Sequence, residues 1–304
     1  MVGWGAPPDV THLQHEVVAI FGPTASGKSA VAKCVADGLG TEVVSADALQ
    51  VYRGLAILTN QPADATRLVA IRELEETMSV GEYATLAHAA IDALVDAHGA
   101  AVVAGGTGLY VRAALADLEI PPAVDDERRA RLELLYDASP EEAHARLAEL
   151  DPAAAACVHA NDRQRVVRAL ELSEVGSTLA PTTRRLWSEQ MRRSTLLVGL
   201  DVPTAELERR IADRTNEMIR RGVVSEVHDA LRRPVSQTAR KALGLDEVAT
   251  LPLDVARERI VARTRRYASY QRKWMRRMPG IVLIDADRPV RQVADDVLDL
   301  ARAR

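Results

Sequence analysis

A glycine-rich loop constrains the fold of this chain more than any other feature. Gly22-Pro23-Thr24-Ala25-Ser26-Gly27-Lys28-Ser29 matches the P-loop pattern G-x-x-x-x-G-K-[ST]. Val17–Phe21 before it is a short β-branched and apolar run, and Ala30–Leu39 after it has helical spacing. In that context the glycines let the backbone surround an anion, while the N–H groups and the helix N-terminus supply positive potential. The alternative is an unrelated loop in a βα unit.

The end of the loop adds two side chains suited to a phosphorylated ligand. Lys28 is a point charge for a terminal phosphate, and the hydroxyl of Ser29 can ligate Mg²⁺. The whole segment Gly22–Ser29 is therefore predicted to bind a diphosphate or a nucleotide, and such loops are typical of ATP-binding proteins.

Further apolar runs place the loop in an open parallel sheet. Glu42–Ala46 and Ala101–Ala104 read as strands, with a helix over Met78–His98 between them. Leu196–Leu200 and Ile281–Ile284 complete five expected strands. Strands that alternate with helices favour an α/β fold, here a P-loop NTPase-like parallel sheet flanked by helices.

The alternation stops between about Pro121 and Arg193. This stretch is rich in Ala, Glu and Arg, and its helical periodicity is interrupted at Pro140, Pro152 and Pro181. We predict an all-helical insertion over residues 121–193, between a first part of the core at 16–120 and a second part at 194–304 that ends in basic helices.

Composition indicates a soluble cytoplasmic protein. The formal net charge of −4 does not by itself favour nucleic acid, so such a partner would need a local basic patch. Cys34 and Cys157 lie far apart without metal-ligand spacing, and no secretory leader is expected. The apolar runs are well short of the roughly 20 residues of a membrane span.

The acid that usually accompanies a nucleotide-hydrolysing P-loop is not at its usual place. Such enzymes often hold Mg²⁺ through an acid that ends a second strand, but Ala101–Ala104 ends in Gly105-Gly106-Thr107-Gly108. Glu42–Ala46 runs instead into Asp47, which should emerge at the carboxyl edge of the sheet. Asp47 there can ligate metal or accept a proton, or it can be a helix N-cap. Gly105–Gly108 suits phosphate contact, or is a plain tight turn.

Several separated segments together resemble the tRNA dimethylallyltransferases, also known as the IPP transferase family. The likeness spans about Val17 to Arg277 and follows the order of that family. The matching segments are the P-loop with its Pro-Thr-Ala, Ser-Ala-Asp-Ala-Leu-Gln-Val-Tyr-Arg-Gly at 45–54, Gly105–Tyr110, Asn161–Leu170 and Thr264–Trp274.

The resemblance implies that the P-loop holds dimethylallyl diphosphate, with Mg²⁺ near Ser29. Asp47 would then act as general base or hydrogen-bond acceptor for N6 of the adenosine at tRNA position 37, beside the anticodon. Thr107 and Arg214 would grip the diphosphate leaving group. The implied substrates are tRNAs that read codons beginning with U, and the enzyme is expected to act as a monomer.

The resemblance also implies a set of residues that contact the tRNA anticodon stem-loop. They are Asp47, Ala48, Leu49, Gln50, Arg163, Gln164, Arg165 and Arg168. The stretch Arg263–Arg277 interleaves seven basic residues with three aromatic ones, which suits phosphate contact and base stacking. Charged helix faces in solvent are the alternative for the 161–168 stretch and for Arg209–Arg214.

The chain departs from the usual pattern of that family in two places. Leu58 and Gln61 stand where a glycine and a lysine are usual, and Lys241–Leu245 lacks an expected aromatic residue. Three other activities therefore stay open: prenyl transfer to free AMP or ATP, a small-molecule P-loop kinase, and an RNA-binding P-loop protein without catalysis.

Overall fold

The computed structural model describes residues 13–118, 120–121, 125–180 and 188–303. The chain forms two compact units. One combines Met1–Asp117 with Glu189–Arg304 and contains the sheet, and the other is Leu118–Ser188.

The larger unit is built on a six-stranded sheet in the order β3-β2-β4-β1-β5-β6. Every strand pair in it is parallel, which confirms the predicted α/β parallel sheet. The strands are β1 (Val17–Phe21), β2 (Val43–Ser45), β3 (Thr66–Arg67), β4 (Ala101–Gly105), β5 (Thr195–Asp201) and β6 (Val282–Asp285). The sequence predicted five of them and missed β3, because two residues are too short to show a pattern.

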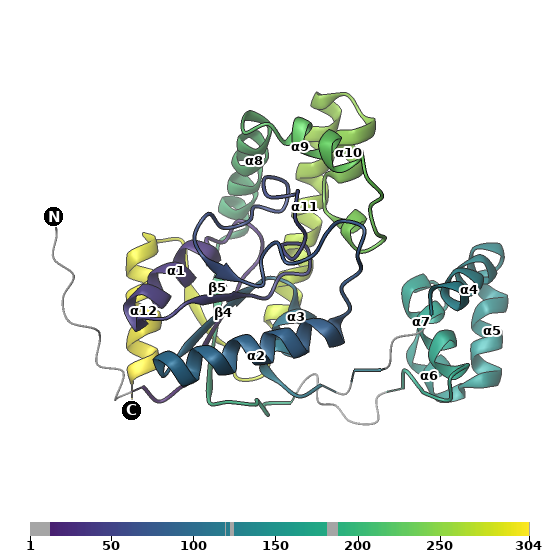
Figure 1. Cartoon of the computed structure of the whole chain (residues 1–304), viewed down its shortest axis with the longest axis horizontal. Helices are drawn as coiled ribbons and strands as arrows, with labels where there is room; N and C mark the ends of the chain where they lie inside the picture. The colour runs from purple at the N-terminus through teal and green to yellow at the C-terminus, as the bar shows by residue number, and fades with distance from the viewer. Residues whose placement is uncertain (1–12, 119, 122–124, 181–187, 304) are drawn as a thin grey trace. The chain divides into compact units, whose positions relative to one another are not determined.

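Helices cover both faces of the sheet. Figure 1 shows α1 (Lys28–Leu39) beside α12 (Val290–Arg302) on one face, and α2 (Val80–His98) beside α3 (Gly108–Leu115) on the other. On α1 the buried residues recur at helical spacing and pack onto apolar residues of β1 and β5. Since β1 lies in the middle of this sandwich, all five of its residues are buried.

A group of helices from the second half of the chain follows β5. It comprises α8 (Thr204–Arg220), α9 (Val223–Ala230), the 3₁₀ helix Ala239–Lys241, α10 (Leu245–Thr250) and α11 (Leu253–Met275). Figure 1 shows α8 and α11 as long helices that pack together beside the sheet. Among the described residues, no helix has both the length and the apolar character to span a membrane.

The smaller unit is helical in its described part and has its own core. Its helices are α4 (Asp126–Ala138), α5 (Pro140–Leu150), α6 (Pro152–Cys157) and α7 (Arg163–Ser173). Leu132, Leu147 and Leu170 are buried together in that core. Helical periodicity is broken at Pro140 and Pro152 as predicted, because each proline opens a new helix, which Ser139 or Asp151 caps. Pro181 lies outside the described residues.

Candidate active site

The P-loop joins β1 to α1 with a backbone shape that suits an anion. Ala25 and Gly27 have φ values of 65° and 88°, in the left-handed region. A Cβ on Gly22 would lie 2.5 Å from the Ser26 hydroxyl, so a larger residue there would displace that side chain. The Ser26 Oγ is buried and has no hydrogen-bond partner among the described residues. A bound anion would supply the missing partner.

Lys28 is held in a setting that disfavours its own charge. The pKa of Lys28 is lowered to about 8: burial is the largest cause, the Asp47 carboxylate opposes it, and the nearby Arg214 guanidinium adds to it. Its ammonium lies 3.5 Å from the Pro23 carbonyl oxygen. Lys28 and Arg214 repel each other unless an anion binds between them, so the pair is suited to a polyphosphate.

The lowered pKa predicts that diphosphate binding depends on the protonation of Lys28. Above pH 8 the free protein carries a neutral Lys28, which must take up a proton to pair with the anion. We expect the Kd for inorganic diphosphate to rise with pH above this value by about tenfold per pH unit. Isothermal titration calorimetry between pH 7 and 9.5 would measure it.

Lys28→Arg is the matched control for this titration. Arginine stays charged over the whole range, so this variant retains only the titration of diphosphate itself. The same pH profile in both proteins would contradict the prediction.

Arg214 reaches the P-loop from α8. Its Nη1 donates a hydrogen bond of 2.6 Å to the Thr24 Oγ1, across 190 residues of sequence. Burial lowers the pKa of Arg214, with Asp47 again acting in the opposite direction. Arg214, which was predicted to grip the diphosphate leaving group, thus contacts the P-loop from α8.

Asp47 follows β2 and lies within electrostatic reach of both cations. Its Oδ1 accepts the Leu49 N–H at 3.0 Å, and the residues that follow form a turn. The helix N-cap alternative is therefore wrong, because no helix begins here. Asp47 also raises the pKa of three tyrosines, which are Tyr83, Tyr110 and Tyr267.

The tyrosines around Asp47 are kept neutral. Burial is the largest cause in each case, and it raises the pKa of Tyr267 to about 12 and those of Tyr83 and Tyr110 still higher. The Tyr83 hydroxyl donates to the Ser45 carbonyl oxygen at 3.0 Å, at the end of β2. Within this group the neutral phenol hydroxyls can donate hydrogen bonds, and the Asp47 carboxylate can accept them.

Thr107 lies at the end of β4, directly before α3. Its Oγ1 is 3.4 Å from the Tyr267 hydroxyl oxygen, which comes from α11. A Cβ on Gly105 would lie 2.2 Å from the Ala46 carbonyl oxygen, and one on Gly106 would lie 2.9 Å from that of Gly22. Gly105 and Gly106 thus allow the ends of β1, β2 and β4 to approach one another closely. Thr107 follows them, so it lies near the P-loop.

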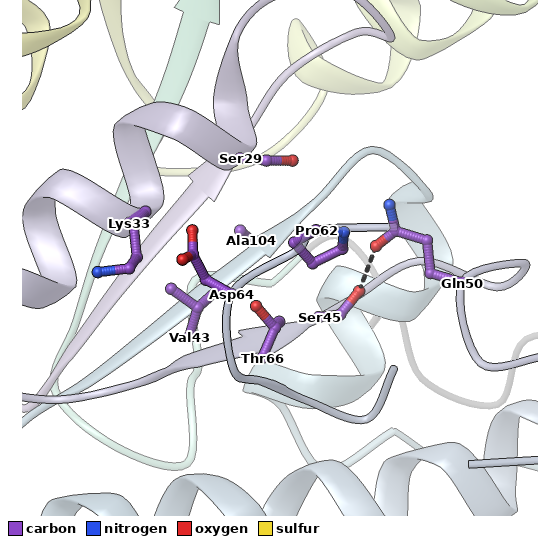
Figure 2. A pocket seen from close by; sticks show the side chains of 9 residues that line it. All are labelled: Ser29, Lys33, Val43, Ser45, Gln50, Pro62, Asp64, Thr66 and Ala104. Carbon is purple, nitrogen blue, oxygen red and sulfur yellow. Dashed lines mark hydrogen bonds between the residues drawn. The ribbon is translucent and has the colours of Figure 1, made fainter. Parts of the chain in front are cut away.

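A small cavity of about 30 Å³ lies beside Ser29. Figure 2 shows Ser29 and Asp64 among the side chains that line it, together with Lys33, Ser45, Gln50 and Thr66. Sequence reasoning missed Asp64, because the loop before β3 carries no motif. Oxygen donors of this kind suit Mg²⁺.

The turn after Asp47 is held from inside the protein. Gln50 donates to the carbonyl oxygens of Thr59 and Asn60 at 3.3 and 3.0 Å, and its Oε1 accepts the Ser45 hydroxyl at 2.9 Å. These three hydrogen bonds stay within the chain, and a tRNA contact by this amide stays a prediction. Ala48 and Leu49 are half-buried in the same turn.

The other predicted tRNA contacts belong to α7 of the helical unit. Arg163 makes two hydrogen bonds of 2.7 Å to Asp137, and Arg168 donates to Glu171 at 3.0 Å. Arg165 and Gln164 are exposed, and Arg165 lies near a carboxylate of its own helix. These side chains are accessible in part, but the ion pairs of Arg163 and Arg168 also stabilise the unit.

In the basic stretch Arg263–Arg277, which includes the end of α11, some cations form ion pairs and others do not. Arg263 forms an ion pair with Glu247, and Arg272 forms one with Asp201 at 3.2 Å. In the described part of the chain, the exposed residues without an ion pair in this stretch are Arg266, Lys273 and Arg276. Tyr270 is 55% exposed on the same helix. Free cations beside an exposed aromatic ring suit single-stranded RNA.

Comparison with known proteins agrees with this arrangement. The family model described as IPP transferase matches residues 50–278. A tRNA dimethylallyltransferase of Kineococcus radiotolerans is 40% identical over 306 residues and aligns over 94% of each chain. The chain belongs to the IPP transferase family. One of Mycobacterium avium is 39% identical over 88% of this chain and 94% of the relative.

Solved structures of the IPP transferase family share the fold. The tRNA isopentenylpyrophosphate transferase of Bacillus halodurans aligns with a TM-score of 0.66 at 27% identity, over 95% of this chain and 98% of the other. A eukaryotic dimethylallyltransferase acting on tRNA aligns with a TM-score of 0.73 over 90% of this chain and 74% of the other. At 24% identity, this second likeness concerns the fold alone.

Leu58 and Gln61, where the chain departs from the usual IPP transferase pattern, both have structural roles. Gln61 donates to the carbonyl oxygens of Gln50 and Tyr52 at 3.1 and 2.7 Å, so it holds the turn that follows Asp47. Leu58 is buried, and the Glu226 carboxylate accepts its N–H at 2.8 Å. The segment is thus anchored on both sides.

Proposed function

We propose that this member of the IPP transferase family transfers a dimethylallyl group from dimethylallyl diphosphate to N6 of adenosine 37 in tRNA. The products are N6-dimethylallyladenosine and diphosphate. The tRNAs that it modifies read codons beginning with U. The names of its relatives support the reaction class, and the geometry around Asp47 supports the roles of the residues.

One observation carries the proposal: an anion site and a proton acceptor meet at the same place. Lys28 and Arg214 concentrate positive charge at the P-loop, and the Asp47 carboxylate interacts with both. A kinase needs the same anion site, but the β4 strand offers no acid for its metal. Prenyl transfer needs an acceptor for the amine proton instead.

The reaction follows from these charges. The bond between the allylic carbon and the diphosphate oxygen breaks, and its electron pair leaves with diphosphate. Lys28, Arg214 and Thr107 stabilise the negative charge that grows on the departing oxygens. The N6 lone pair forms the new C–N bond, and Asp47 accepts the N6 proton. Since the target base must leave its stack to reach Asp47, it enters the site flipped out.

Mg²⁺ fits the donors at this site. Ser29 and Asp64 would hold it, because a hydroxyl and a carboxylate are oxygen ligands and line one cavity. No cluster of three or more His, Cys, Asp or Glu side chains occurs among the described residues, so water and the diphosphate would complete its shell. Mg²⁺ usually keeps several waters in this way. When bound, it neutralises charge on the leaving diphosphate.

The metal assignment predicts that Ser29→Ala and Asp64→Asn each weaken divalent-cation binding. In the presence of inorganic diphosphate, we expect the Kd for Mn²⁺ to rise by about tenfold in either variant. Electron paramagnetic resonance of free Mn²⁺ would measure it without any turnover. Asp246→Asn is the control, since Asp246 is exposed and pairs with Arg240 away from this cavity. Wild-type affinity in both test variants would refute the assignment.

The α11 surface supports tRNA as the prenyl acceptor. Arg266, Lys273 and Arg276 are exposed cations, and a free nucleotide would not need a basic helix of this length. Their contacts with phosphates would make binding salt-dependent.

Labelled dimethylallyl diphosphate distinguishes the candidate functions. The purified protein is incubated with Mg²⁺, the labelled donor, and unmodified tRNA, AMP or ATP in separate reactions. We expect label only on tRNA, and at N6 of adenosine 37 after nuclease digestion. Label on AMP or ATP alone would instead identify an adenylate prenyltransferase. Label on none of them, with RNA still bound, would indicate an RNA-binding protein without this activity.

A further inference from the structure

Gln271 on α11 joins two segments of the site proposed to bind the prenyl donor, dimethylallyl diphosphate. Its Oε1 accepts the Thr24 N–H at 2.8 Å, and its Nε2 donates to the Gly106 carbonyl oxygen at 2.9 Å. The side chain is only 2% exposed, so both ends of the amide are engaged in a buried setting. One side chain therefore links the P-loop to the turn that follows β4.

The contact around this amide leaves no room for adjustment. A Cβ on Gly106 would lie 2.4 Å from the Gln271 Nε2 and 2.9 Å from the Gly22 carbonyl oxygen. The Gly22 N–H also donates to the Gly105 carbonyl oxygen at 3.4 Å. The P-loop, the turn and α11 thus approach one another closely around this amide.

Neighbouring turns of α11 contact the same turn after β4. One turn before Gln271, the Tyr267 hydroxyl lies 3.4 Å from the Thr107 Oγ1. On the other side, Trp274 packs on Gly108, where a Cβ would lie 2.2 Å from its ring. This face of α11 therefore packs along the segment that carries Thr107.

The two partners of Gln271 belong to residues with proposed roles at the diphosphate. Thr24 also accepts the hydrogen bond from Arg214, and Gly106 precedes Thr107 in the chain. The Gln271 amide thus lies between the P-loop with its arginine on one side and the threonine on the other. A change in the distance between these two segments would move Arg214 and Thr107 relative to each other, and so relative to a diphosphate bound between them.

We propose that Gln271 is a positioning residue that holds the P-loop and the Gly106–Thr107 turn at the separation that a diphosphate requires. The proposal rests on the proposed function of these segments as the donor site. It needs a side chain with one acceptor and one donor at this reach. Glutamine provides both, ionised glutamate lacks the donor, and leucine lacks both.

Binding of inorganic diphosphate tests the proposal without prenyl chemistry. By calorimetry with Mg²⁺ present, we expect the Kd of Gln271→Leu to rise by about tenfold or more, because two buried backbone groups lose their partner. Gln271→Glu should bind at least as weakly, since it sets a carboxylate against the Gly106 carbonyl oxygen. In kinetics, KM for the donor should rise while KM for tRNA changes by less than about threefold.

Thr41→Val is the matched control. The Thr41 hydroxyl donates to the Ala100 carbonyl oxygen at 2.7 Å, so it too joins two segments, but at the amino-terminal ends of β2 and β4. We expect this variant to have a lower melting temperature than the wild type but an unchanged Kd for diphosphate. Melting temperatures of all variants, from thermal unfolding, show how far stability alone accounts for any effect.

Two results would overturn the role of Gln271. One is wild-type diphosphate affinity in folded Gln271→Leu, and the other is a loss of affinity that Thr41→Val reproduces at an equal drop in melting temperature. Failure of the proposed function looks different: the wild type would bind diphosphate with Gln271-dependent affinity but would not prenylate tRNA.

Discussion

Replacing Asp47 with asparagine is expected to lower the single-turnover rate of prenyl transfer by about 10²-fold or more. Asparagine retains the oxygen that accepts the Leu49 N–H, so the turn after β2 should persist. What it loses is the charge and the basicity that receive the N6 proton. Rapid-quench measurement with labelled donor and saturating tRNA isolates this chemical step from product release.

The Asp47→Asn variant should still bind both substrates. We expect the Kd for tRNA to stay within about threefold of the wild type, since one carboxylate is exchanged for an amide of the same shape. Asp37→Asn controls for the loss of an acidic residue near the P-loop, because Asp37 pairs with Lys33 on the exposed side of α1. Undiminished turnover in Asp47→Asn would remove this residue from catalysis.

The fold could be predicted where its signals are local. The runs that became β1 and β4 are apolar and bounded by turn residues, and the P-loop follows β1 directly. The order of strands in the sheet could not be predicted in the same way, because it depends on pairing between distant segments. β3 has only two residues, and it is specified by its pairing with β2.

The candidate site shows the same division between local and distant signals. Asp47 and Thr107 were found from their places after strands, since the carboxyl ends of parallel strands share one edge of the sheet. Arg214 came only from the family resemblance, because its charge pattern on α8 matches that of a solvated helix. Gln271 was not found, although it is buried on the P-loop, since a single glutamine in a basic helix carries no signal.

Gln50, a predicted tRNA contact, also has a role within the chain. The segment at 45–54 resembles its family as a whole, but the sequence does not separate side chains that meet a ligand from those that shape the turn. In the structure, the Gln50 amide makes its hydrogen bonds to Ser45, Thr59 and Asn60. It therefore supports the segment that carries Asp47.

Arg214→Ala is expected to lower kcat by about 10²- to 10³-fold, the effect of removing one donor from a developing oxyanion. The guanidinium donates to Thr24 in the P-loop, so its charge would lie beside a diphosphate bound there. Arg214→Lys should recover part of the loss, because it retains the charge but not the two-pronged geometry. Steady-state kinetics with dimethylallyl diphosphate as the varied substrate would measure both variants.

Arg209→Ala is the control on the same helix. Arg209 is exposed and pairs with Glu206 and Asp213, so its removal should change kcat by less than about twofold. Equal losses in Arg209→Ala and Arg214→Ala would mean that α8 acts only through its stability.

The pH dependence of diphosphate binding provides a second test of Arg214 with a definite sign. In the free protein the Arg214 charge lowers the pKa of Lys28, whereas the Asp47 charge raises it. Arg214→Ala should therefore move the pH at which diphosphate affinity begins to fall to a higher value, and Asp47→Asn should move it to a lower one. Calorimetry across the same pH range measures both shifts. A loss of stability alone would not shift this pH in opposite directions in the two variants. Opposite shifts would therefore place both residues within electrostatic reach of the Lys28 ammonium.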